Sequence, residues 1–278
     1  KTRAIVARYI NRASVSSRKG VALLSFTNAA VDEVGRRCSS RLELLTHPHF
    51  VGTFDSFIQK FVFGPRFATD NLRVARFIES WDVQDITKII PNPQRPFEGL
   101  SLESFDFDEH GAATLVPSRI SATYRQHMVG IYQARKSFCD TKAAQIRTGR
   151  LQRGFVSCSE ARRQTLFWLR DPSKRSIIAA RLASRFSEVI VDEAQDCGPE
   201  ELELLRALRE AGVVISIVGD PDQAIFEFRN AVPELVVEFG QGLESQITFS
   251  DNYRSSPSIC KMNSALRVAG EPDVAKGE

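Results

Sequence analysis

Two adjacent carboxylates, Asp192 and Glu193, follow the apolar run at residues 189–191. An apolar strand that ends in an acidic pair is the arrangement that nucleotide hydrolysis uses. The first acid holds a magnesium ion, usually through water, and the second can take a proton from the attacking water. The same pair would also form where a buried strand runs into a solvated loop, and a bare pair of acids favours that simpler interpretation. The surrounding sequence is needed to distinguish a hydrolytic site from a solvated loop.

Four more short apolar runs are followed at once by polar or acidic residues. They lie at residues 21–24, 50–51, 213–218 and 247–249. Uninterrupted runs of this kind, rich in β-branched side chains, are typical of strands buried on both faces, as in a parallel sheet. The patterns between them predict four helices. The first covers residues 2–11, and the second runs to residue 37 with Asn28 as its N-cap. The third begins at Pro199, a proline in the first helical position, and the fourth runs from Pro257 towards residue 268. Strands that alternate with helices predict an α/β domain whose ligands lie at the carboxyl ends of the strands.

The stretch from about residue 66 to 180 differs from its flanks. It lacks apolar strand runs, contains a turn-rich segment at 91–96, and then becomes arginine-rich and helical in pattern. We expect a second, mostly helical domain inserted into the α/β domain.

Charge is also distributed unevenly. Residues 133–185 hold thirteen Arg and Lys against three acids, a balance of +10 in a chain whose net charge is +3, so the remainder sums to −7. A basic segment in an acidic remainder indicates a polyanion partner, although charge alone is equally compatible with a solvated helical face.

Several classes of protein are disfavoured by composition. The five cysteines are an odd number without a CxxC pair, which argues against a disulfide framework or a zinc cluster and fits a reducing, cytoplasmic compartment. No apolar run approaches the ~18 residues of a membrane span, and no signal peptide is visible. None of the four histidines has a ligand-like spacing, and no GxSxG nucleophile motif occurs.

The surroundings of the acidic pair are far more specific than the pair itself. It opens the sequence DEAQD at 192–196, and GDPDQAIFEFRNA follows at 219–231. SFTNAA at 25–30 and GTFDSF at 52–57 precede it, and NYRS at 252–255 comes last. These five segments, in this order and with a large insert between the second and third, resemble motifs Ia, Ib, II, III and IV of the UvrD/Rep/PcrA family of superfamily 1 DNA helicases. Lys1 and Thr2 then look like the end of a phosphate-binding loop of the GxxGxGKT type, cut just before the lysine.

The resemblance implies a RecA-like, P-loop NTPase motor domain with a parallel sheet, interrupted by a mostly α-helical domain. Motor domain 1A would occupy residues 1–65 and 181–250, the insertion domain 1B residues 66–180, and the start of motor domain 2A residues 251–278. Motifs V and VI of the family are not in this chain.

ATP and Mg²⁺ are the implied ligands. Lys1 would neutralise the β- and γ-phosphates. Thr2 and Asp192 would hold the magnesium ion, and Glu193 would activate the attacking water.

Four more residues match the family's nucleotide contacts. Gln223 matches the glutamine that senses the γ-phosphate, and Arg254 matches the arginine that stabilises charge on the transferring phosphoryl group. Tyr253 matches the aromatic residue on which adenine stacks, and Arg3 is a weaker candidate for a nucleotide contact.

The DNA side is implied in the same way. Phe26, Phe226 and Phe228 stand where the family places aromatic residues that stack on successive bases, a contact that tolerates any sequence. With 19 phenylalanines in the chain, core packing is the alternative for each. The candidate contacts to the DNA backbone are Thr27, Asn28, Thr53 and Arg229.

Some positions depart from the family pattern. Asp55 stands where relatives often have His, which places an acid near the expected DNA path. Glu227 and Asn230 stand where Gly is common, so the turn of motif III could differ in detail. Cys197 replaces a common Thr, and we expect a buried or inert thiol there.

Our leading hypothesis is an ATP-dependent helicase or translocase that moves 3′→5′ on single-stranded DNA and acts at duplex junctions, with this fragment inactive alone. A nuclease or repair factor is a possible protein partner, and no membrane is implied. One alternative is a DNA- or partner-binding module without hydrolysis, and another is the helicase subunit of a helicase–nuclease or defence system. We also expect Arg162 and Arg163, in the basic segment, to lie along the DNA backbone.

Overall fold

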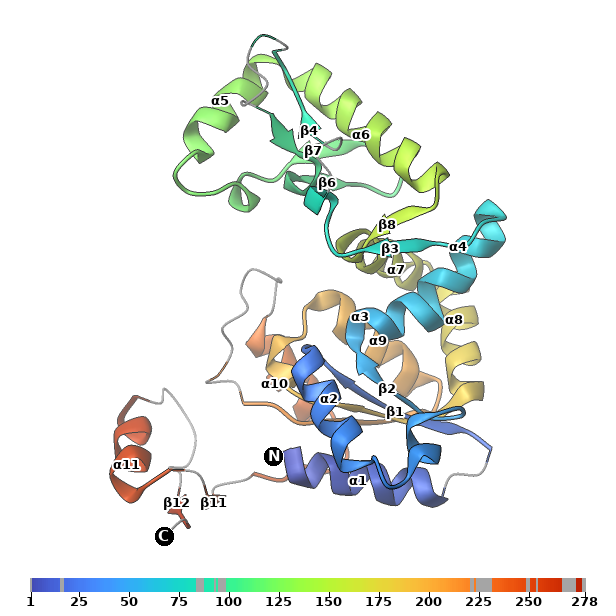
Figure 1. The fold of residues 1–278 in the computed structure, drawn as a ribbon, viewed down its shortest axis with the longest axis vertical. Helices are drawn as coiled ribbons and strands as arrows, with labels where there is room; N and C mark the ends of the chain where they lie inside the picture. Colours follow the sequence, from blue (N-terminus) through green and yellow to red (C-terminus); the bar gives the residue numbers. More distant parts are fainter. Residues whose placement is uncertain are drawn as a thin grey trace. The chain divides into compact units, whose positions relative to one another are not determined.

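The computed structural model describes residues 2–15, 18–83, 88–92, 94, 99–220, 223, 232–248, 251–253, 255–266 and 274–276. The chain forms two compact units, one made of residues 1–54 and 175–278 and the other of residues 55–174. Each unit is described by itself below (Figure 1). Their limits differ by about ten residues from the sequence-based domain limits, which stay a prediction.

The first unit is an α/β unit. Its strands are β1 (Gly20–Ser25), β2 (Phe50–Thr53), β9 (Phe186–Val191), β10 (Val214–Ile217), β11 (Asp251–Asn252) and β12 (Val274–Ala275). Its helices are α1 (Thr2–Val15), α2 (Asn28–Arg37), α8 (Pro172–Arg185, which begins in the other unit), α9 (Pro199–Glu210), α10 (Pro233–Gln241) and α11 (Pro257–Leu266).

Four parallel strands form the central sheet in the order β10-β9-β1-β2. Every residue of β1 is buried, as a strand needs to be when helices cover both faces of its sheet. Figure 1 shows helices on both sides of these strands. The α1 side chains Ile5 and Tyr9 pack with Val21 and Leu23 of β1 in one apolar cluster. The prediction of a parallel-sheet α/β unit from short apolar runs is therefore confirmed.

Glu188 ties α1 to two strands of this sheet. Its carboxylate is fully buried in β9 and accepts hydrogen bonds from Arg8 Nε (2.6 Å) and Arg12 Nε (2.7 Å) of α1. Ser216 Oγ of β10 donates a third bond over 2.9 Å. A buried charge needs such partners, and the pairing accounts for the extension of α1 beyond the expected end at Asn11.

Two sequence expectations need correction. Thr27, not Asn28, caps α2, because the Thr27 hydroxyl accepts from the Ala30 N–H over 3.3 Å and Asn28 is already helical. Residues 247 and 248 lie in no strand, and Phe249 is outside the described residues. Among the described residues no strand pairs with the far side of β10, so residues 247–248 do not extend the sheet there.

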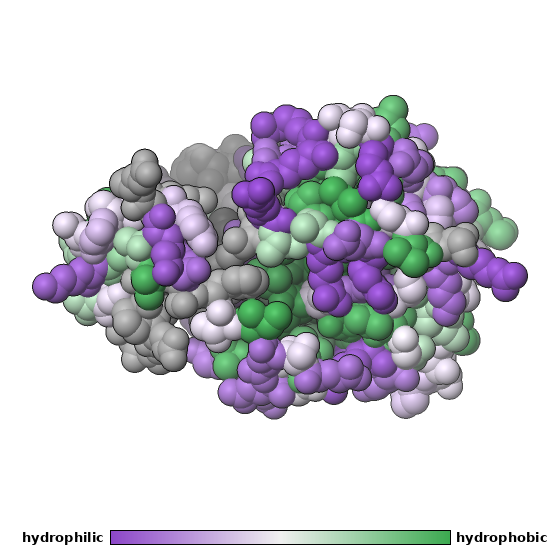
Figure 2. All heavy atoms as spheres, turned by 90° about the horizontal axis from the view of Figure 1, so that it is seen from below, coloured by the Kyte–Doolittle hydropathy of each residue, from purple (hydrophilic) through white to green (hydrophobic). Residues whose placement is uncertain are grey.

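A groove of about 550 Å³ runs along this edge of the sheet. α1, β10 and residues 243–247 line it. Val214 and Ile247 expose 43% and 79% of their surface there. Figure 2 shows apolar side chains between polar ones on the face of the molecule that carries α1. β10 is therefore an open edge strand within the described part of the chain.

The second unit combines helices with small sheets. Its helices are α3 (Phe54–Phe57, which starts in the first unit), the π-helix η2 (Ile58–Phe63), α4 (Gly64–Asn71), α5 (Arg125–Ala134), α6 (Lys136–Gln152) and α7 (Cys158–Arg170). Its strands are β3 (Arg76–Ile78), β4 (Lys88–Ile89), β5 (Leu100–Ser101), β6 (Phe105–Phe107), β7 (Ala113–Leu115) and β8 (Phe155–Ser157). They pair as β3-β8, β4-β5 and β6-β7. These short pairs are what the sequence did not predict, because strands of two or three residues carry no measurable period.

A buried ionic cluster holds the second unit together. The Glu160 carboxylate is fully buried and accepts three hydrogen bonds of 2.5–3.0 Å from Arg147. It also pairs with Arg163. Both guanidinium groups lie 4.9 Å from the centre of the Phe107 ring. Burial lowers the pKa of Arg163 to about 10, because the largely buried cation has lost most of its contact with water.

No helix in the described part of the chain is long and apolar enough to cross a membrane.

We predict that Glu160→Gln strongly destabilises the second unit. The substitution leaves Arg147 and Arg163 buried without their shared counter-charge, a loss that costs about 3–5 kcal/mol in comparable sites. Chemical denaturation followed by circular dichroism measures the change. The control is Glu109→Gln, since Glu109 is exposed and its nearest partner is the exposed His110. A loss below about 1 kcal/mol would contradict the role given to the cluster.

We also predict that the first unit loses stability as the pH falls below about 6.5. His49 is 8% exposed, and its Nδ1 accepts a hydrogen bond from the Val21 N–H. Burial, aided by the nearby His47, lowers the pKa of His49. A depressed histidine pKa means that the unfolded state takes up the proton first, so the contribution of neutral His49 is present above the unfolded pKa and lost below it.

Denaturant unfolding between pH 5 and 7.5 measures this effect. His49→Asn, which keeps an acceptor but cannot titrate, should flatten the dependence, and the exposed His110→Asn should leave it unchanged. An unaltered slope in His49→Asn would exclude His49 as its source.

Candidate active site

The carboxyl ends of β1, β9 and β10 meet at one edge of the sheet, and main-chain hydrogen bonds continue past the strands there. The Asp192 N–H donates to Leu24 O over 2.8 Å, and the Ala194 N–H donates to Val218 O over 2.9 Å. The Val218 N–H donates back to Val191 O. The acidic pair after β9 is therefore fixed beside the start of the loop after β10, rather than lying in a solvated loop.

Glu193 has an unusual backbone. Its φ of 53° and ψ of 46° lie in the left-handed region, which costs a non-glycine residue of order 1–3 kcal/mol. The Glu193 N–H donates to Asp192 Oδ1 over 3.0 Å, and the Gln195 Nε2 donates to Glu193 Oε2 over 2.8 Å. Asp192 is only 4% exposed, whereas Glu193 is half-buried. The Asp192 carboxylate is thus enclosed, and the Glu193 carboxylate is partly accessible at the carboxyl edge of the sheet.

Gln195 and Asp220 are contacts that the sequence did not single out. Gln195 is 3% exposed, and its Oε1 accepts from the Asp220 N–H over 2.9 Å. Gly219 favours this approach, because a Cβ there would lie 3.0 Å from Gln195 Oε1, a tighter contact than most Cβ atoms make. The only sequence signal was the place of Gln195 inside DEAQD, since a buried glutamine has no spacing of its own.

Gln223 stands on the same loop. Its N–H donates to Asp220 O over 2.9 Å and its Nε2 donates to Asp220 Oδ2 over 2.6 Å. The structure thus connects Glu193, Gln195, Asp220 and Gln223 through hydrogen bonds. The other expected residues of this loop, Phe226, Phe228, Arg229, Glu227 and Asn230, lie outside the described residues.

The phosphate side is described only in part. Thr2 opens α1, but the position of its side chain is not described, and Lys1 and Arg254 lie outside the described residues. Arg3 is exposed on α1. Tyr253 is 74% exposed, and its hydroxyl donates to Asp251 Oδ2 over 3.4 Å.

The donor set suits magnesium. The Asp192 carboxylate is enclosed at the end of β9, and Ser25 follows Leu24, the partner of Val191 in the sheet register. The Ser25 hydroxyl is 1% exposed and has no hydrogen-bond partner among the described residues. Carboxylate and hydroxyl oxygens are hard donors of the kind Mg²⁺ prefers. Within the described residues there is no cluster of three or more His, Cys, Asp or Glu, as a softer or fully protein-enclosed metal site would need.

The residues of motifs Ia and Ib that we expect to contact DNA all lie in the described part of the chain. Phe26 is 9% exposed and stacks on Phe54, with ring centres 5.6 Å apart. Because Phe54 already covers one face of the Phe26 ring, base stacking by Phe26 stays a prediction. Thr27 and Asn28 are exposed at the start of α2, and Thr53 is half-buried at the end of β2.

Asp55 is neutralised within the second unit. Its carboxylate pairs with Arg162 of α7, and both side chains are less than one quarter exposed. The acid that departs from the family pattern therefore has a matching cation in the same unit.

Cys197, the other departure in a described position, is fully buried. Burial, followed by the charges of Glu201 and Asp196, raises the pKa of its thiol well above the usual value. The expectation of a buried thiol is confirmed.

The basic segment at 133–185 is not a uniform phosphate-facing surface, which corrects the expectation for Arg162 and Arg163. Arg163 is 13% exposed and engaged by Glu160 and Asp106, and Arg162 is engaged by Asp55. Linear charge could not reveal this because the matching acids Asp106 and Asp55 lie 57 and 107 residues away in the chain.

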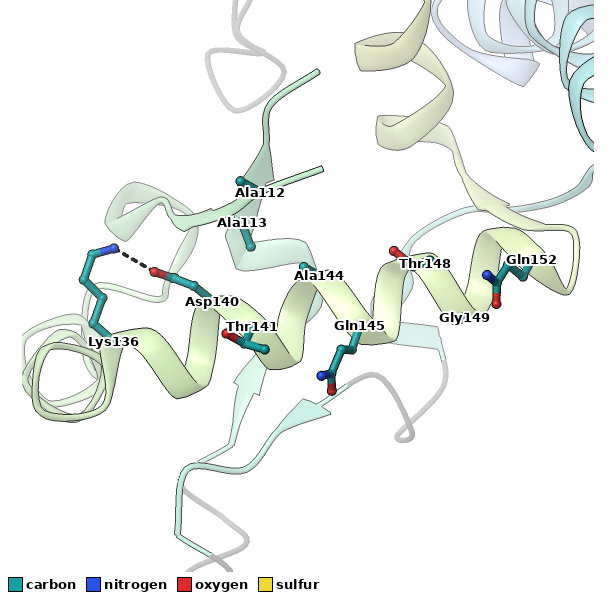
Figure 3. A pocket seen from close by; sticks show the side chains of 10 residues that line it. All are labelled: Ala112, Ala113, Lys136, Asp140, Thr141, Ala144, Gln145, Thr148, Gly149 and Gln152. Atoms are coloured by element: carbon teal, nitrogen blue, oxygen red, sulfur yellow. Dashed lines mark hydrogen bonds and ion pairs between the residues drawn. The ribbon is translucent and has the colours of Figure 1, made fainter. Parts of the chain in front are cut away.

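A different part of the same segment is open. Arg135, Lys142 and Arg153 are exposed, and none of the three has an ion-pair partner among the described residues. Lys142 lies within α6, and Arg135 and Arg153 stand at its amino and carboxyl ends. The 17 residues of α6 span roughly 26 Å at 1.5 Å per residue. Figure 3 shows the neighbouring face of α6, where Thr141, Gln145 and other small or polar side chains line an open groove of about 770 Å³.

Comparison with known proteins agrees with this geometry. DNA helicase II of Escherichia coli is 25% identical over 284 residues, which cover 96% of this chain and 36% of that protein. The ATP-dependent DNA helicase Rep of E. coli is 32% identical over 99 residues, 35% of this chain and 15% of Rep. A component of the ATP-dependent helicase/nuclease of Lactobacillus delbrueckii is 36% identical over 97 residues, 32% of this chain and 8% of that protein. The chain thus spans about a third or less of the length of these relatives.

The family model of the UvrD/REP helicase N-terminal domain matches residues 1–244, which include the whole of the second unit and the central sheet of the first. Together with the acidic pair fixed between β1 and β10, this match shows that the chain belongs to the UvrD/REP helicase family.

Proposed function

We propose that the chain is the N-terminal motor part of an ATP-dependent DNA helicase or translocase that moves 3′→5′ on single-stranded DNA. The observation that carries the proposal is the hydrogen-bonded set of Asp192, Glu193, Gln195 and Asp220 at the carboxyl edge of a parallel sheet. A hydrolytic site needs an enclosed carboxylate for a metal and an accessible one for water, and this edge supplies both.

Each residue has a defined task in the proposed reaction. Lys1 binds the β- and γ-phosphates of ATP, while Thr2 and Asp192 hold Mg²⁺, which neutralises developing negative charge when bound. Glu193 accepts a proton from the attacking water at its carboxylate. Gln223 contacts the γ-phosphate and Arg254 stabilises the transferring group. Tyr253 and Arg3 bind the nucleotide, with the exposed Tyr253 ring available for adenine.

DNA contacts are assigned to two sets of residues. Bases stack on Phe26, Phe226 and Phe228, and the DNA backbone contacts Thr27, Asn28, Thr53 and Arg229. We add Lys142 of α6 and the flanking residues Arg135 and Arg153. Their charges are not engaged by acids of the described chain and therefore remain available for phosphates, including those of a duplex junction.

The helicase component of a helicase–nuclease is the second candidate. Relatives from L. delbrueckii and Lactobacillus johnsonii carry this name, and they are 36% and 31% identical to this chain over 97 and 102 residues. In that case the partner is a nuclease, and the motor chemistry of Asp192 and Glu193 is unchanged. Nuclease assays on the intact protein, with and without ATP, separate the two candidates.

The five free cysteines agree with a reducing, cytoplasmic setting.

We predict that Glu193→Gln in the intact protein lowers kcat for ATP hydrolysis by about 10²–10⁴-fold, because the amide cannot accept the proton of water. ATP binding should survive, since Glu193 is not a phosphate or metal ligand in the proposal. Steady-state hydrolysis and filter binding of ATP measure the two properties. The neighbouring Glu200→Gln is the control, because Glu200 lies in the first turn of α9 and is not part of the hydrogen-bonded set. Turnover retained in Glu193→Gln would refute its role as the base.

We further predict that Lys142→Glu with Arg153→Glu weakens DNA binding and reduces the slope of log K against log salt by up to about 2, because each phosphate that is no longer neutralised lowers the slope by close to one. Titration of labelled DNA between 50 and 200 mM salt measures the slope.

The contrasting pair is Arg162→Gln with Arg163→Gln. Because these cations are engaged inside the second unit, their loss should lower the thermal midpoint and leave the salt slope unchanged. The opposite pattern, a slope that responds to Arg162 and Arg163 but not to Lys142 and Arg153, would contradict the assignment.

A further inference from the structure

Both polar groups of the Gln195 side-chain amide form hydrogen bonds, one to Glu193 and the other to the loop after β10. The Nε2 group donates to the Glu193 carboxylate over 2.8 Å, and Oε1 accepts from the Asp220 N–H over 2.9 Å. The side chain is 3% exposed, so water does not substitute readily for either partner. One buried amide therefore joins the proposed water-activating group to the first residues of the loop after β10.

The chemistry of the two partners fixes the orientation of this amide. A reversed amide would place its NH₂ group against the Asp220 N–H and its oxygen against the Glu193 carboxylate, two repulsive contacts. Only a side chain with one donor and one acceptor at this length satisfies both partners. Glutamate keeps the acceptor for Asp220 but loses the donor for Glu193, and methionine keeps the volume but loses both.

The surroundings leave little freedom for Gln195 to move. A Cβ at Gly219 would lie 3.0 Å from Gln195 Oε1 and 3.1 Å from its N, so the loop packs directly on this residue. The Ala194 N–H, bonded to Val218 O, fixes the backbone on the other side. A displacement of the loop at Gly219 or Asp220 must therefore move Gln195, and with it the Glu193 carboxylate.

The same loop carries the expected DNA contacts. Along the sequence, Asp220 leads to Gln223 and then to Phe226, Phe228 and Arg229, to which the proposed function assigns γ-phosphate sensing and DNA binding. The left-handed backbone of Glu193 is held by its own hydrogen bonds, because its N–H donates to Asp192 and its carbonyl accepts from the Asp196 N–H. Its half-buried carboxylate, by contrast, has the bond from Gln195 as its side-chain hydrogen bond within the described residues, so Gln195 sets the position of that carboxylate.

We propose that Gln195 is a positioning residue that couples the loop at 219–223 to the water-activating Glu193, so that DNA engagement sets the rate of hydrolysis through this amide. The inference rests on the proposed function. Gln195 touches neither water nor nucleotide in this role and acts only through Glu193.

The test uses the intact protein with and without single-stranded DNA. Gln195→Glu is expected to lower the DNA-stimulated kcat by roughly 10–100-fold, because the carboxylate repels Glu193 from its productive position. The KM for ATP and the Kd for DNA should stay within about 3-fold, since the binding residues are untouched. Gln195→Met, similar in volume, should also lose DNA stimulation, and Gln241→Met on the exposed end of α10 is the matched control.

A double substitution separates positioning from a general structural role. In the Glu193→Gln background, Gln195→Glu should cause no further loss of kcat, because the residue through which Gln195 acts is already disabled. Additive losses, or a rise in the KM for ATP that parallels the fall in kcat, would overturn the proposal. So would a folded Gln195→Met variant with normal DNA stimulation.

The outcome for Glu193→Gln alone distinguishes the two levels of failure. If that variant is inactive while the Gln195 variants behave like the wild type, the coupling is wrong and the proposed function stands. If Glu193→Gln itself retains turnover, the hydrolytic assignment falls, and the coupling falls with it.

Discussion

The parallel register of β9 with β1 and β10 is the constraint on which the candidate site depends. Strands that run in the same direction bring their carboxyl ends to one edge, and three main-chain hydrogen bonds extend the ladder beyond the last strand residues. Asp192 is thereby enclosed and Glu193 is turned outward in a left-handed conformation. Ion pairs from Glu188 of β9 to Arg8 and Arg12 hold α1 against the same strands. The helix that starts at Thr2 is therefore fixed relative to the acidic pair.

The sequence was sufficient for the sheet because a buried parallel strand has a strong signature. Uninterrupted apolar runs marked β1, β9 and β10, and proline at the first helical position marked α9. The strands of two or three residues in the second unit were not predictable, since pairing such as that of Phe77 with Val156 is decided by partners far apart in the chain. The helix cap moved from Asn28 to Thr27 because both residue types cap well and only the hydrogen bond distinguishes them.

In the candidate site, too, the sequence identified residues within local motifs but not contacts between distant parts of the chain. Asp192, Glu193 and Gln223 were identifiable from motif order, whereas the link that Gln195 makes to Asp220 depends on an approach across 25 residues of chain. Charge was the weaker guide. The +10 balance at 133–185 included Arg163, whose side chain is largely buried against Glu160 and Asp106, while the open cations lie within α6 and at its two ends. A linear count cannot separate these groups because it ignores which acids fold against them.

We propose that this edge of the sheet hydrolyses ATP under the control of DNA. The most direct measurement is the rate of phosphate release by the intact protein with Mg²⁺-ATP, in the presence and absence of single-stranded DNA. The account predicts slow hydrolysis alone and a clear increase with DNA of any sequence, since stacking and phosphate contacts do not discriminate between bases. DNA binding without hydrolysis, or hydrolysis at a rate that DNA does not change, would contradict the account.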